Sequence, residues 1–479
     1  MAVLENLEPK RVFGFFEQMC AIPHGSGNTK AISDWLKAFA DARGLEVHQD
    51  SMGNVIIIKE ASAGYEKADP VIFQGHMDMV CEKAPGCTKD MQTEGLDLVT
   101  DGDTVYAEGT TLGSDDGIAV AMALAILDDP EIQHPRFEAV FTVDEEIGML
   151  GAVDIDVSAL KGRRMMNLDS ENEGVFTVSC AGGNISRCIL PVTRTPFDGT
   201  VLRLTVGGLQ GGHSGVEIDK GRGNSNMLMG RVLYAVSKAT DMRLICVNGG
   251  LKDNAISQET VAVIVAADAD SVKTACAQME AALKNEYRST DAGVFTAVEQ
   301  TEANALPMDA AGTQNALCLL TCAPNGIQAM SHEIDGLVQT SLNLGVLKTE
   351  EQQISASFCV RSSVETQKQM LVDRLSCLMS VLGGSVEVSG DYPGWEFQKD
   401  SALRDLMAEV YTEQYDEAPK IEAIHAGVEC GMFAGKLPGL DCVSFGPDLT
   451  EIHTFRERMH IASVQRTWKL VVEILRRMK

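Results

Sequence analysis

The order of apolar and polar positions predicts alternating strands and helices in the first part of the chain. Short apolar runs bounded by turn residues are typical of buried strands, and the Ala-rich run from Ile118 to Leu127, which stops before Pro130, is typical of a buried helix. This alternation indicates an α/β layer with a largely parallel sheet up to residue 182. Strands are expected at 54–59, 71–74, 138–143 and 164–168, and further helices at 8–22 and 29–42.

Beyond Gly182-Gly183 the pattern changes to half-buried strands, a Gly-rich loop and longer helices, which predict an α+β domain. Near Tyr392 the chain is expected to return to the first domain. The predicted fold class is therefore α/β, with a mostly parallel-sheet domain at 1–182 and 393–479 and an inserted α+β domain at 183–392. The later helices are expected at 224–238, 271–287, 365–382, 401–415 and 461–478, and strands at 201–206, 261–267, 354–360 and 442–445.

Composition narrows the class of protein. The 479 residues carry 40 basic and 68 acidic side chains, and a net charge of −28 argues against nucleic acid or an anionic membrane as a partner. The thirteen cysteines form no C-x-x-C pair, so we expect reduced thiols and a cytoplasmic protein. No signal peptide is visible, and the longest apolar run is too short to cross a bilayer.

Histidine and carboxylate side chains follow the predicted strands or begin the predicted buried helix. The carboxyl ends of parallel strands meet at one edge of a sheet, where ligands bind. One carboxylate in such a place is usually a solvated surface acid, but recurrence at the same edge predicts a metal site. Nitrogen and oxygen donors without a thiolate favour Zn, Mn or Co in an open catalytic site. These residues are His76, Asp78, Asp115, Asp116, Glu145, Glu146, Asp169 and His453.

Taken in order, these motifs resemble those of the M20 metallopeptidases. The resemblance covers nearly the whole chain, and it is carried by Gly75-His76-Met77-Asp78, Leu112 to Gly117, Asp144 to Gly148, Asn167-Leu168-Asp169, Gly211 to Gly215 and the late His453. The long insert, Pro393-Gly394-Trp395 and His425 to Gly431 are similar to the aminoacyl-histidine dipeptidase branch (cytosol non-specific dipeptidases) of that family. One departure is His453-Thr454-Phe455, where the family often has Ser-Pro after the histidine. His460 is nearby, but His453 follows the strand predicted at 442–445 and is kept as the late histidine of the motif.

The resemblance implies two divalent ions, with Zn favoured and Mn or Co as alternatives. One ion would be bound by His76 and Asp169, the other by Glu146 and His453, and Asp115 would bridge them. Adjacent residues of an extended chain point opposite ways, which agrees with separate roles for Glu145 and Glu146. The resemblance also implies a cis peptide between Asp115 and Asp116.

Further roles come from the same resemblance. Asp78 would orient His76, Glu145 would be the general base, and His213 in the Gly-rich loop would reach the developing oxyanion. Arg361 would bind the substrate carboxylate, for which a guanidinium is suited. For His213 the simpler alternative is a loop histidine without a role. For Arg361 it is a surface salt bridge. Further candidate substrate-binding residues are Asn254, His425 and Glu429.

The expected function is hydrolysis of unblocked dipeptides, including Xaa-His, by a cytoplasmic metallopeptidase. The inserted domain would be a lid and dimerisation domain, so a homodimer is expected, and His213 could act within one chain or across a dimer. The metal ligands do not determine which acyl group is cleaved. An N-acyl amino acid deacylase or a carboxypeptidase of the same superfamily is therefore the first alternative. A non-catalytic binding protein with a vestigial site is the second.

Overall fold

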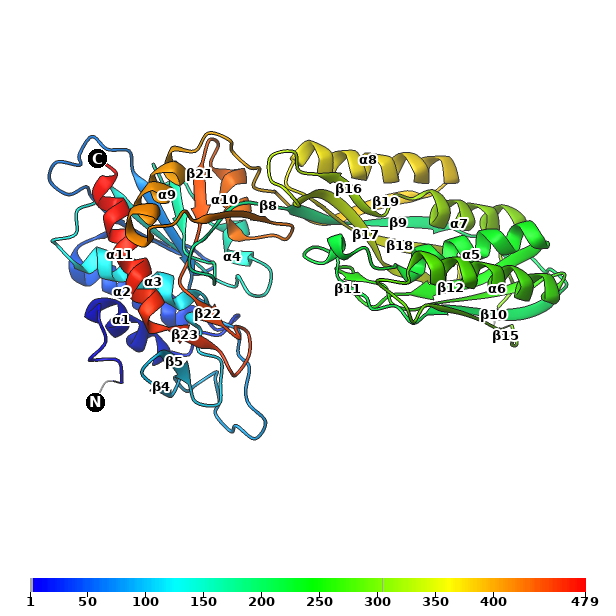
Figure 1. Cartoon of the computed structure of the whole chain (residues 1–479), viewed down its shortest axis with the longest axis horizontal. Helices are drawn as coiled ribbons and strands as arrows, with labels where there is room; N and C mark the ends of the chain where they lie inside the picture. Colours follow the sequence, from blue (N-terminus) through cyan, green and yellow to red (C-terminus); the bar gives the residue numbers. More distant parts are fainter. Residues whose placement is uncertain (1–2, 304) are drawn as a thin grey trace. The chain divides into compact units, whose positions relative to one another are not determined.

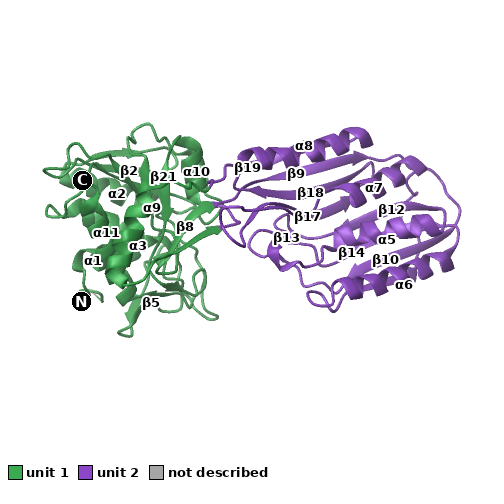
Figure 2. Ribbon diagram, turned by 45° about the horizontal axis from the view of Figure 1, so that its top comes forward, with its two compact units in different colours: residues 1–179, 397–423, 428–479 green, residues 180–396, 424–427 purple. Residues whose placement is uncertain are grey.

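The computed structural model of the chain describes residues 3–303 and 305–479, which divide into two units (Figures 1 and 2). The first unit comprises Met1–Ser179, Phe397–Ala423 and Val428–Lys479, and the second comprises Cys180–Glu396 and Ile424–Gly427. The short segment Ile424–Gly427 lies within the range that the sequence analysis gave to the first domain. It joins the second unit because the Ala181 N–H donates to the carbonyl oxygens of Ile424 and Ala426 at 3.2 and 3.0 Å.

The first unit is built on an eight-stranded sheet in the order β1-β2-β6-β3-β7-β21-β8-β20. Its central strands β6, β3, β7 and β21 run parallel to one another. Every residue of β3 and β6 is buried, as expected for strands covered on both faces. The strands are β1 (Glu46–Gln49), β2 (Val55–Lys59), β3 (Val71–His76), β6 (Phe137–Thr142), β7 (Arg164–Asn167), β8 (Val175–Cys180), β20 (Lys420–Ile424) and β21 (Asp441–Ser444).

Helices pack around this sheet, and α3 (Ser114–Asp128) contacts both α1 and β3. Its residues from Asp116 to Leu127 are buried because the helix is apolar on all sides. The other helices of the unit are α1 (Lys10–Cys20), α2 (Lys30–Arg43), α4 (Leu150–Asp154), α9 (Ala402–Tyr415), α10 (Glu429–Lys436) and α11 (Ile461–Arg477). A small sheet contains β4 (Leu98–Thr100), β5 (Thr104–Ala107), β22 (Leu449–Thr450) and β23 (Arg458–His460).

The second unit is built on a nine-stranded sheet in which β15-β10-β14-β12-β17-β18-β9-β19 follow one another and β16 pairs with β17. Its strands are β9 (Gly182–Pro191), β10 (Thr200–Gly207), β12 (Met242–Gly249), β14 (Thr260–Ala266), β15 (Phe295–Gln300), β16 (Gly326–Met330), β17 (Val338–Thr349), β18 (Gln353–Ser362) and β19 (Ser385–Tyr392). The remaining elements are β11 (Gly212–His213), β13 (Ala255–Ile256), the short 3-10 helix η1 (Ile218–Lys220), α5 (Ser225–Ala239), α6 (Ala269–Glu286), α7 (Ala310–Cys322) and α8 (Glu365–Leu382). The pairings between neighbouring strands of this sheet are antiparallel.

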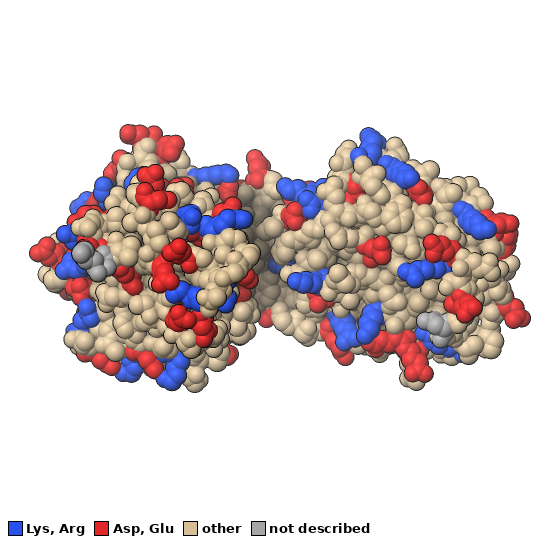
Figure 3. All heavy atoms as spheres, turned by 90° about the horizontal axis from the view of Figure 1, so that it is seen from below, with Lys and Arg blue, Asp and Glu red and all other residues tan. Residues whose placement is uncertain are grey.

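The predicted fold class, α/β with a mostly parallel central sheet, is confirmed. Among the described residues no helix is long and apolar enough to cross a membrane. On the face drawn in Figure 3, acidic and basic side chains are interspersed over both units. Some of the surface charges pair with each other, as Arg231 and Glu286 do.

Candidate active site

The first candidate ligand, His76, is the last residue of β3 and is 1% exposed. Its Nδ1 lies 3.0 Å from the backbone carbonyl oxygen of Asp78. A carbonyl only accepts hydrogen bonds, so Nδ1 carries the ring proton and Nε2 faces the site. Nε2 lies 3.2 Å from Oδ1 of Asp115 and 3.5 Å from Oδ1 of Asp169. The predicted neighbours of His76 are thus brought together at the carboxyl edge of the sheet.

Asp115 lies between two histidines. Its Oδ1 faces Nε2 of His76, and its Oδ2 is 3.1 Å from Nε2 of His453. The same His453 nitrogen is 3.1 Å from Oε1 of Glu146. One carboxylate is therefore shared between a His76 side and a His453 side of the site. The peptide between Asp115 and Asp116 is cis, as predicted.

The close approach of α3 to β3 places Asp116 beneath this cluster. Oδ2 of Asp116 accepts a hydrogen bond from the backbone N–H of His76 at 3.3 Å, and the side chain is 1% exposed. A Cβ on Gly75 would lie 2.4 Å from this oxygen and 2.7 Å from Cβ of Ala119. Only a glycine at position 75 therefore allows the helix start to sit against the strand end.

The Asp78 carboxylate holds the opposite side of the site. It accepts hydrogen bonds from the hydroxyl of Ser26 at 2.8 Å and from the backbone N–H groups of Glu145 and Glu146 at 3.0 and 3.4 Å. Its distance to Nδ1 of His76 is 3.5 Å, longer than the bond from that nitrogen to the carbonyl oxygen of Asp78. Asp78 therefore fixes His76 mainly through its backbone and fixes the 145–146 segment through its side chain.

Burial, with a smaller contribution from neighbouring acids, raises the pKa of carboxylates in this cluster. Burial raises the pKa of Glu145 to about 9 and that of Asp169 to about 6, and repulsion from neighbouring carboxylates adds to both increases. Burial likewise raises the pKa of Glu171, which is not among the predicted site residues, to about 7. Hydrogen bonds to Asp115 and Glu146 raise the pKa of His453 to about 10. Each shift shows that the cluster favours added positive charge.

The donor set fits divalent cations. Three groups of side chains each bring one ligand atom per residue within 4.8 Å of one another. Buried carboxylates are costly unless a cation balances them, and imidazole with carboxylate donors suits Zn, Mn or Co. The groups are His76 with Asp116 and Asp169, His76 with Glu145 and Glu146, and Asp115 with Glu146 and His453.

Glu429, at the start of α10, is 0% exposed and lies behind the strand ends. Its Oε2 accepts hydrogen bonds from Nε2 of Gln74 at 2.5 Å and from the hydroxyl of Thr142 at 2.7 Å. Its Oε1 has no hydrogen-bond partner among the described residues. Its carboxylate therefore supports the sheet edge through β3 and β6, and its contact with substrate stays a prediction.

The second unit contains a separate polar cluster around Gly215. A Cβ on this glycine would lie 2.9 Å from Cε1 of His213, 3.2 Å from Nε of Arg361 and 2.5 Å from the carbonyl oxygen of His425. Nδ1 of His213 accepts hydrogen bonds from the N–H groups of Gly215 and Val216, both at 3.2 Å. The ring proton therefore sits on Nε2, which is left to donate. Burial, followed by the charge of Arg361, lowers the pKa of His213.

Arg361 is 7% exposed and forms no ion pair in the parts of the chain that the structure describes, so it is not a surface salt bridge. Its Nη1 donates to the hydroxyl of Tyr392 at 3.1 Å, and its buried Nε has no hydrogen-bond partner there. Ser341, directly opposite Arg361 on the paired strand, lies 2.7 Å from Nε2 of His425. Burial, then the charge of Arg361, lowers the pKa of His425 to about 3. A buried guanidinium with a free donor is suited to an anionic ligand.

Asn254, the last predicted substrate-binding residue, is exposed next to the Gly-rich loop. Its backbone carbonyl oxygen accepts a hydrogen bond from the N–H of Ser214 at 2.9 Å. The hydroxyl of Ser214 is buried without a hydrogen-bond partner in the described structure. The loop of His213 is thus tied to Asn254 through the backbone.

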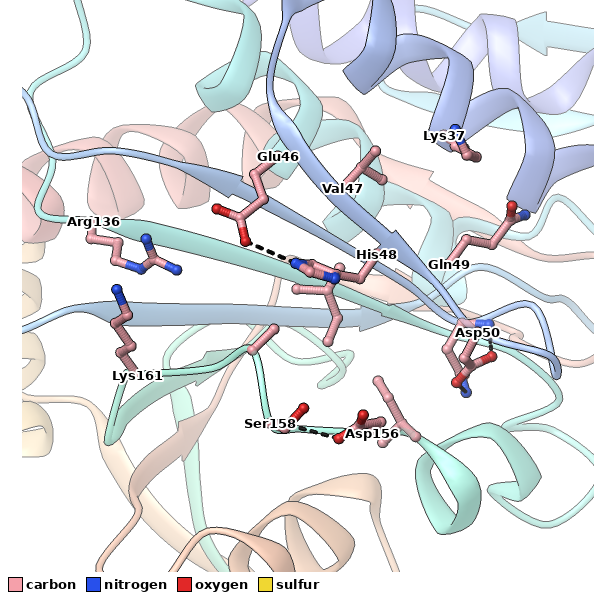
Figure 4. Close-up of a pocket in the computed structure, with 14 residues that line it drawn as sticks. Lys37, Glu46, Val47, His48, Gln49, Asp50, Arg136, Asp156, Ser158 and Lys161 are labelled. Carbon is pink, nitrogen blue, oxygen red and sulfur yellow. Dashed lines mark hydrogen bonds and ion pairs between the residues drawn. The ribbon is translucent and has the colours of Figure 1, made fainter.

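A different hollow of about 780 Å³ lies beside β1 in the first unit (Figure 4). The Glu46 carboxylate faces the His48 ring at 2.9 Å, and the Asp156 carboxylate accepts from the N–H of Ser158 at 2.9 Å. Arg136, also in its wall, pairs with Glu60, 76 residues earlier in the chain. The residues that line this hollow are not among the predicted metal ligands.

The chain matches known proteins over nearly its whole length. The family model for peptidase family M20/M25/M40 matches residues 72–477. The cytosol non-specific dipeptidase of Escherichia coli (strain K12) is 36% identical over 480 residues, which cover 99% of each chain. The crystal structure of aminoacylhistidine dipeptidase from Vibrio alginolyticus has a TM-score of 0.94 and 35% identity, covering 99% of this chain and 97% of that chain.

A more distant structure, the aminopeptidase PepT from Bacillus cereus, is 17% identical with a TM-score of 0.58 and covers 98% of this chain and 99% of that chain, which shows the fold alone. The resemblance inferred from the motifs is confirmed by the family match and by the two full-length relatives. The chain belongs to peptidase family M20/M25/M40.

Proposed function

We propose that this chain is a metal-dependent dipeptidase that hydrolyses unblocked dipeptides, including those with a C-terminal histidine. The observation that carries the proposal is the position of Asp115, whose two oxygens face His76 and His453 at 3.2 and 3.1 Å. Two full-length relatives named as dipeptidases support the substrate class. The name of the Escherichia coli relative also supports a cytoplasmic location.

We assign His76 and Asp169 to one divalent ion, Glu146 and His453 to a second, and Asp115 to both. This assignment follows the distances, since Asp169 lies on the His76 side of Asp115 and Glu146 lies on the His453 side. The donor chemistry favours Zn, with Mn or Co as alternatives. When bound, such ions supply an acidified water and polarise the scissile carbonyl.

Glu145 is the proposed general base. Its backbone N–H donates to Asp78, which holds the residue next to the ligands without using its side chain. The carboxylate would take the proton of the attacking water and pass it to the leaving amine. Cations at the neighbouring ligands would lower the raised pKa of Glu145 and so favour the carboxylate form that a base needs.

The cluster of the second unit is proposed to bind the anionic parts of the substrate. Arg361 would bind the terminal carboxylate through its free Nε and its Nη groups, with His425 and Asn254 beside it. The Nε2–H of His213 would donate to the developing negative charge on the carbonyl oxygen. His213 and Arg361 both contact the space at Gly215, so we propose that one chain supplies both groups.

The second unit is also the proposed lid and dimerisation domain, and we expect a homodimer in solution. Light scattering coupled to gel filtration distinguishes a chain mass of 51.5 kDa from twice that mass. A monomer with full activity would remove the dimer from the proposal but would leave the assignment of His213 and Arg361 to one chain intact.

The proposed activity is tested with the Zn- and Mn-reconstituted protein and five substrates: Ala-His, β-Ala-His, Leu-Gly, a tripeptide and an N-acetyl amino acid. Cleavage confined to the dipeptides is the expected result. Cleavage of the N-acetyl compound alone would instead support a deacylase of the same family. Binding of two metals without cleavage of any of the five would support a vestigial site.

A further inference from the structure

A buried carboxylate, that of Glu457, is bound by three consecutive backbone N–H groups. Oε2 of Glu457 accepts from the N–H groups of Leu112 and Gly113 at 2.7 and 3.0 Å. Oε1 accepts from the N–H of Ser114 at 2.8 Å and from its hydroxyl at 2.5 Å. Glu457 is 2% exposed, so water does not compete for these four bonds.

The local backbone explains why an anion fits there. Gly113, the residue before α3, has φ of 69° and no side-chain cap. Its left-handed conformation turns successive N–H groups toward one point, which creates a concave anion site. This site precedes the regular part of α3, because Asp115 and Asp116 have non-helical φ and ψ. A Cβ on Gly113 would lie 2.8 Å from Sδ of Met79, so a larger residue does not fit. The Glu457 carboxylate therefore occupies the anion site that this turn forms.

Each of the two segments joined by this contact also carries a proposed metal ligand. Ser114 immediately precedes Asp115, and Glu457 follows His453 by four residues. Between residues 450 and 457 only Glu457 is buried, and the His453 side chain is 48% exposed. The exposed loop that carries His453 is thus anchored at its far end by Glu457. The 3.1 Å distance between His453 and Asp115 depends on both loops keeping their positions.

We propose that Glu457 is a positioning residue of the metal centre. It joins the Asp115 loop to the His453 loop and holds them at the separation needed to bind one ion together. The inference rests on the proposed function, because it presumes that Asp115, Glu146 and His453 bind a divalent cation. Glu457 itself lies outside that ligand set, with its carboxylate oxygens occupied by backbone and hydroxyl donors.

The test is the affinity of the chelated, folded protein for Zn²⁺, measured by calorimetry on the full chain with Glu457→Gln. The amide turns an NH₂ group toward backbone donors, so the loops separate. Loss of such a supporting contact weakens metal affinity by about 10- to 100-fold, here at the site of Asp115, Glu146 and His453. Glu457→Asp keeps the charge but is too short for all four bonds, so it is expected to weaken affinity as well. Together the two variants separate the effect of loop position from the effect of the charge at residue 457.

A matched control is Glu138→Gln. Glu138 is 0% exposed and accepts hydrogen bonds from the N–H groups of Lys161 and Gly162 at 2.9 to 3.1 Å and from Nε of Arg136 at 2.8 Å. It lies near the start of β6, whereas the metal centre lies beyond its end. This variant is expected to lower the melting temperature while leaving Zn²⁺ affinity unchanged. A purely structural role for Glu457 predicts the same behaviour for Glu457→Gln.

Ser114→Ala provides a second variant that removes only the hydroxyl bond and keeps the three backbone bonds. Its expected loss of affinity is a few-fold, and it reports on the contact even when Glu457→Gln does not fold. Wild-type affinity in Glu457→Gln, or in Ser114→Ala when the first variant is unfolded, would overturn the inference. A wild-type chain that binds no divalent ion would overturn the proposed function, and this result is obtained before any variant is measured.

Discussion

The polar clusters of the two units shift the pKa of a histidine in opposite directions. In the first unit, hydrogen bonds to Asp115 and Glu146 raise the pKa of His453 to about 10. In the second unit, burial and the charge of Arg361 lower the pKa of His425 to about 3. One cluster has an excess of carboxylates, and the other has a buried guanidinium without an ion pair among the described residues.

This difference indicates which ligand each cluster is built to receive. A group of buried acids is stabilised by cations, whereas a buried guanidinium with a free donor is stabilised by an anion. Under the proposed function, the terminal carboxylate of a dipeptide is the anion expected at the second cluster, and divalent ions are expected at the first. Substitutions in one cluster or the other separate these contributions.

Glu145→Gln tests the acidic cluster without removing a proposed ligand. The loss of the general base is expected to lower kcat for Ala-His by about 10²- to 10⁴-fold. Metal content, measured by mass spectrometry on the dialysed protein, is expected to match the wild type. Activity close to that of the wild type would exclude Glu145 as the base.

Arg361→Lys tests the anion-binding cluster. Lysine keeps the charge but loses the planar set of donors, and a hydrogen bond to a charged group contributes about 2 kcal/mol, or about 30-fold in kcat/KM. The loss is expected for Ala-His and to be much smaller for Ala-His amide, which lacks the carboxylate. An equal loss for both substrates would show that Arg361 does not bind that group.

The lowered pKa of His425 predicts a dependence of stability on pH. The unfolded chain takes up a proton near pH 6.5, whereas the folded residue does so only near pH 3, so this residue lowers stability as the pH falls between these values. His425→Gln cannot take up the proton, and its stability is expected to fall less steeply from pH 7 to pH 5.

The measurement is urea unfolding followed by the fluorescence of Trp395, which is buried in the second unit. Trp35 and Trp468 are replaced by phenylalanine in both proteins, so that only this unit is observed. Parallel loss of stability in the two proteins would contradict the assigned neutral state of His425.

Ser341→Ala is expected to give the smallest effect. It removes the 2.7 Å hydrogen bond to His425, and one such bond contributes about 1 kcal/mol, or about 5-fold. The expected change is an increase in KM for Ala-His with little change in kcat. A fall in kcat with constant KM would give this pair a role in the chemical step instead.

Sequence patterns predicted those helices and strands whose buried positions are mainly apolar. The helix α8 was predicted with its observed bounds, Glu365–Leu382, and α3 was recognised from its alanines. The strand β17 was missed because it buries polar residues such as Thr340, Ser341 and Asn343, which interrupt an apolar pattern. Burial by neighbouring strands is a property of the assembled sheet and leaves little trace in the local sequence.

The candidate site shows the same limit. Residues at strand ends, such as His76 and Asp169, were found because the sheet topology brings them to one edge. Glu457 was missed, since its partners lie 343 to 345 residues earlier in the chain. Glu429 was recognised as part of a motif, but its burial against Gln74 and Thr142 could be learned only from the folded chain.

The most direct test of the account is a metal titration of the chelated protein with hydrolysis of Ala-His as the signal. We expect no activity without metal, and activity that rises with added Zn²⁺ or Mn²⁺ and reaches its plateau at two equivalents per chain. Activity that persists at full strength after complete removal of metal would contradict a metal-dependent dipeptidase built on His76, Asp115 and His453.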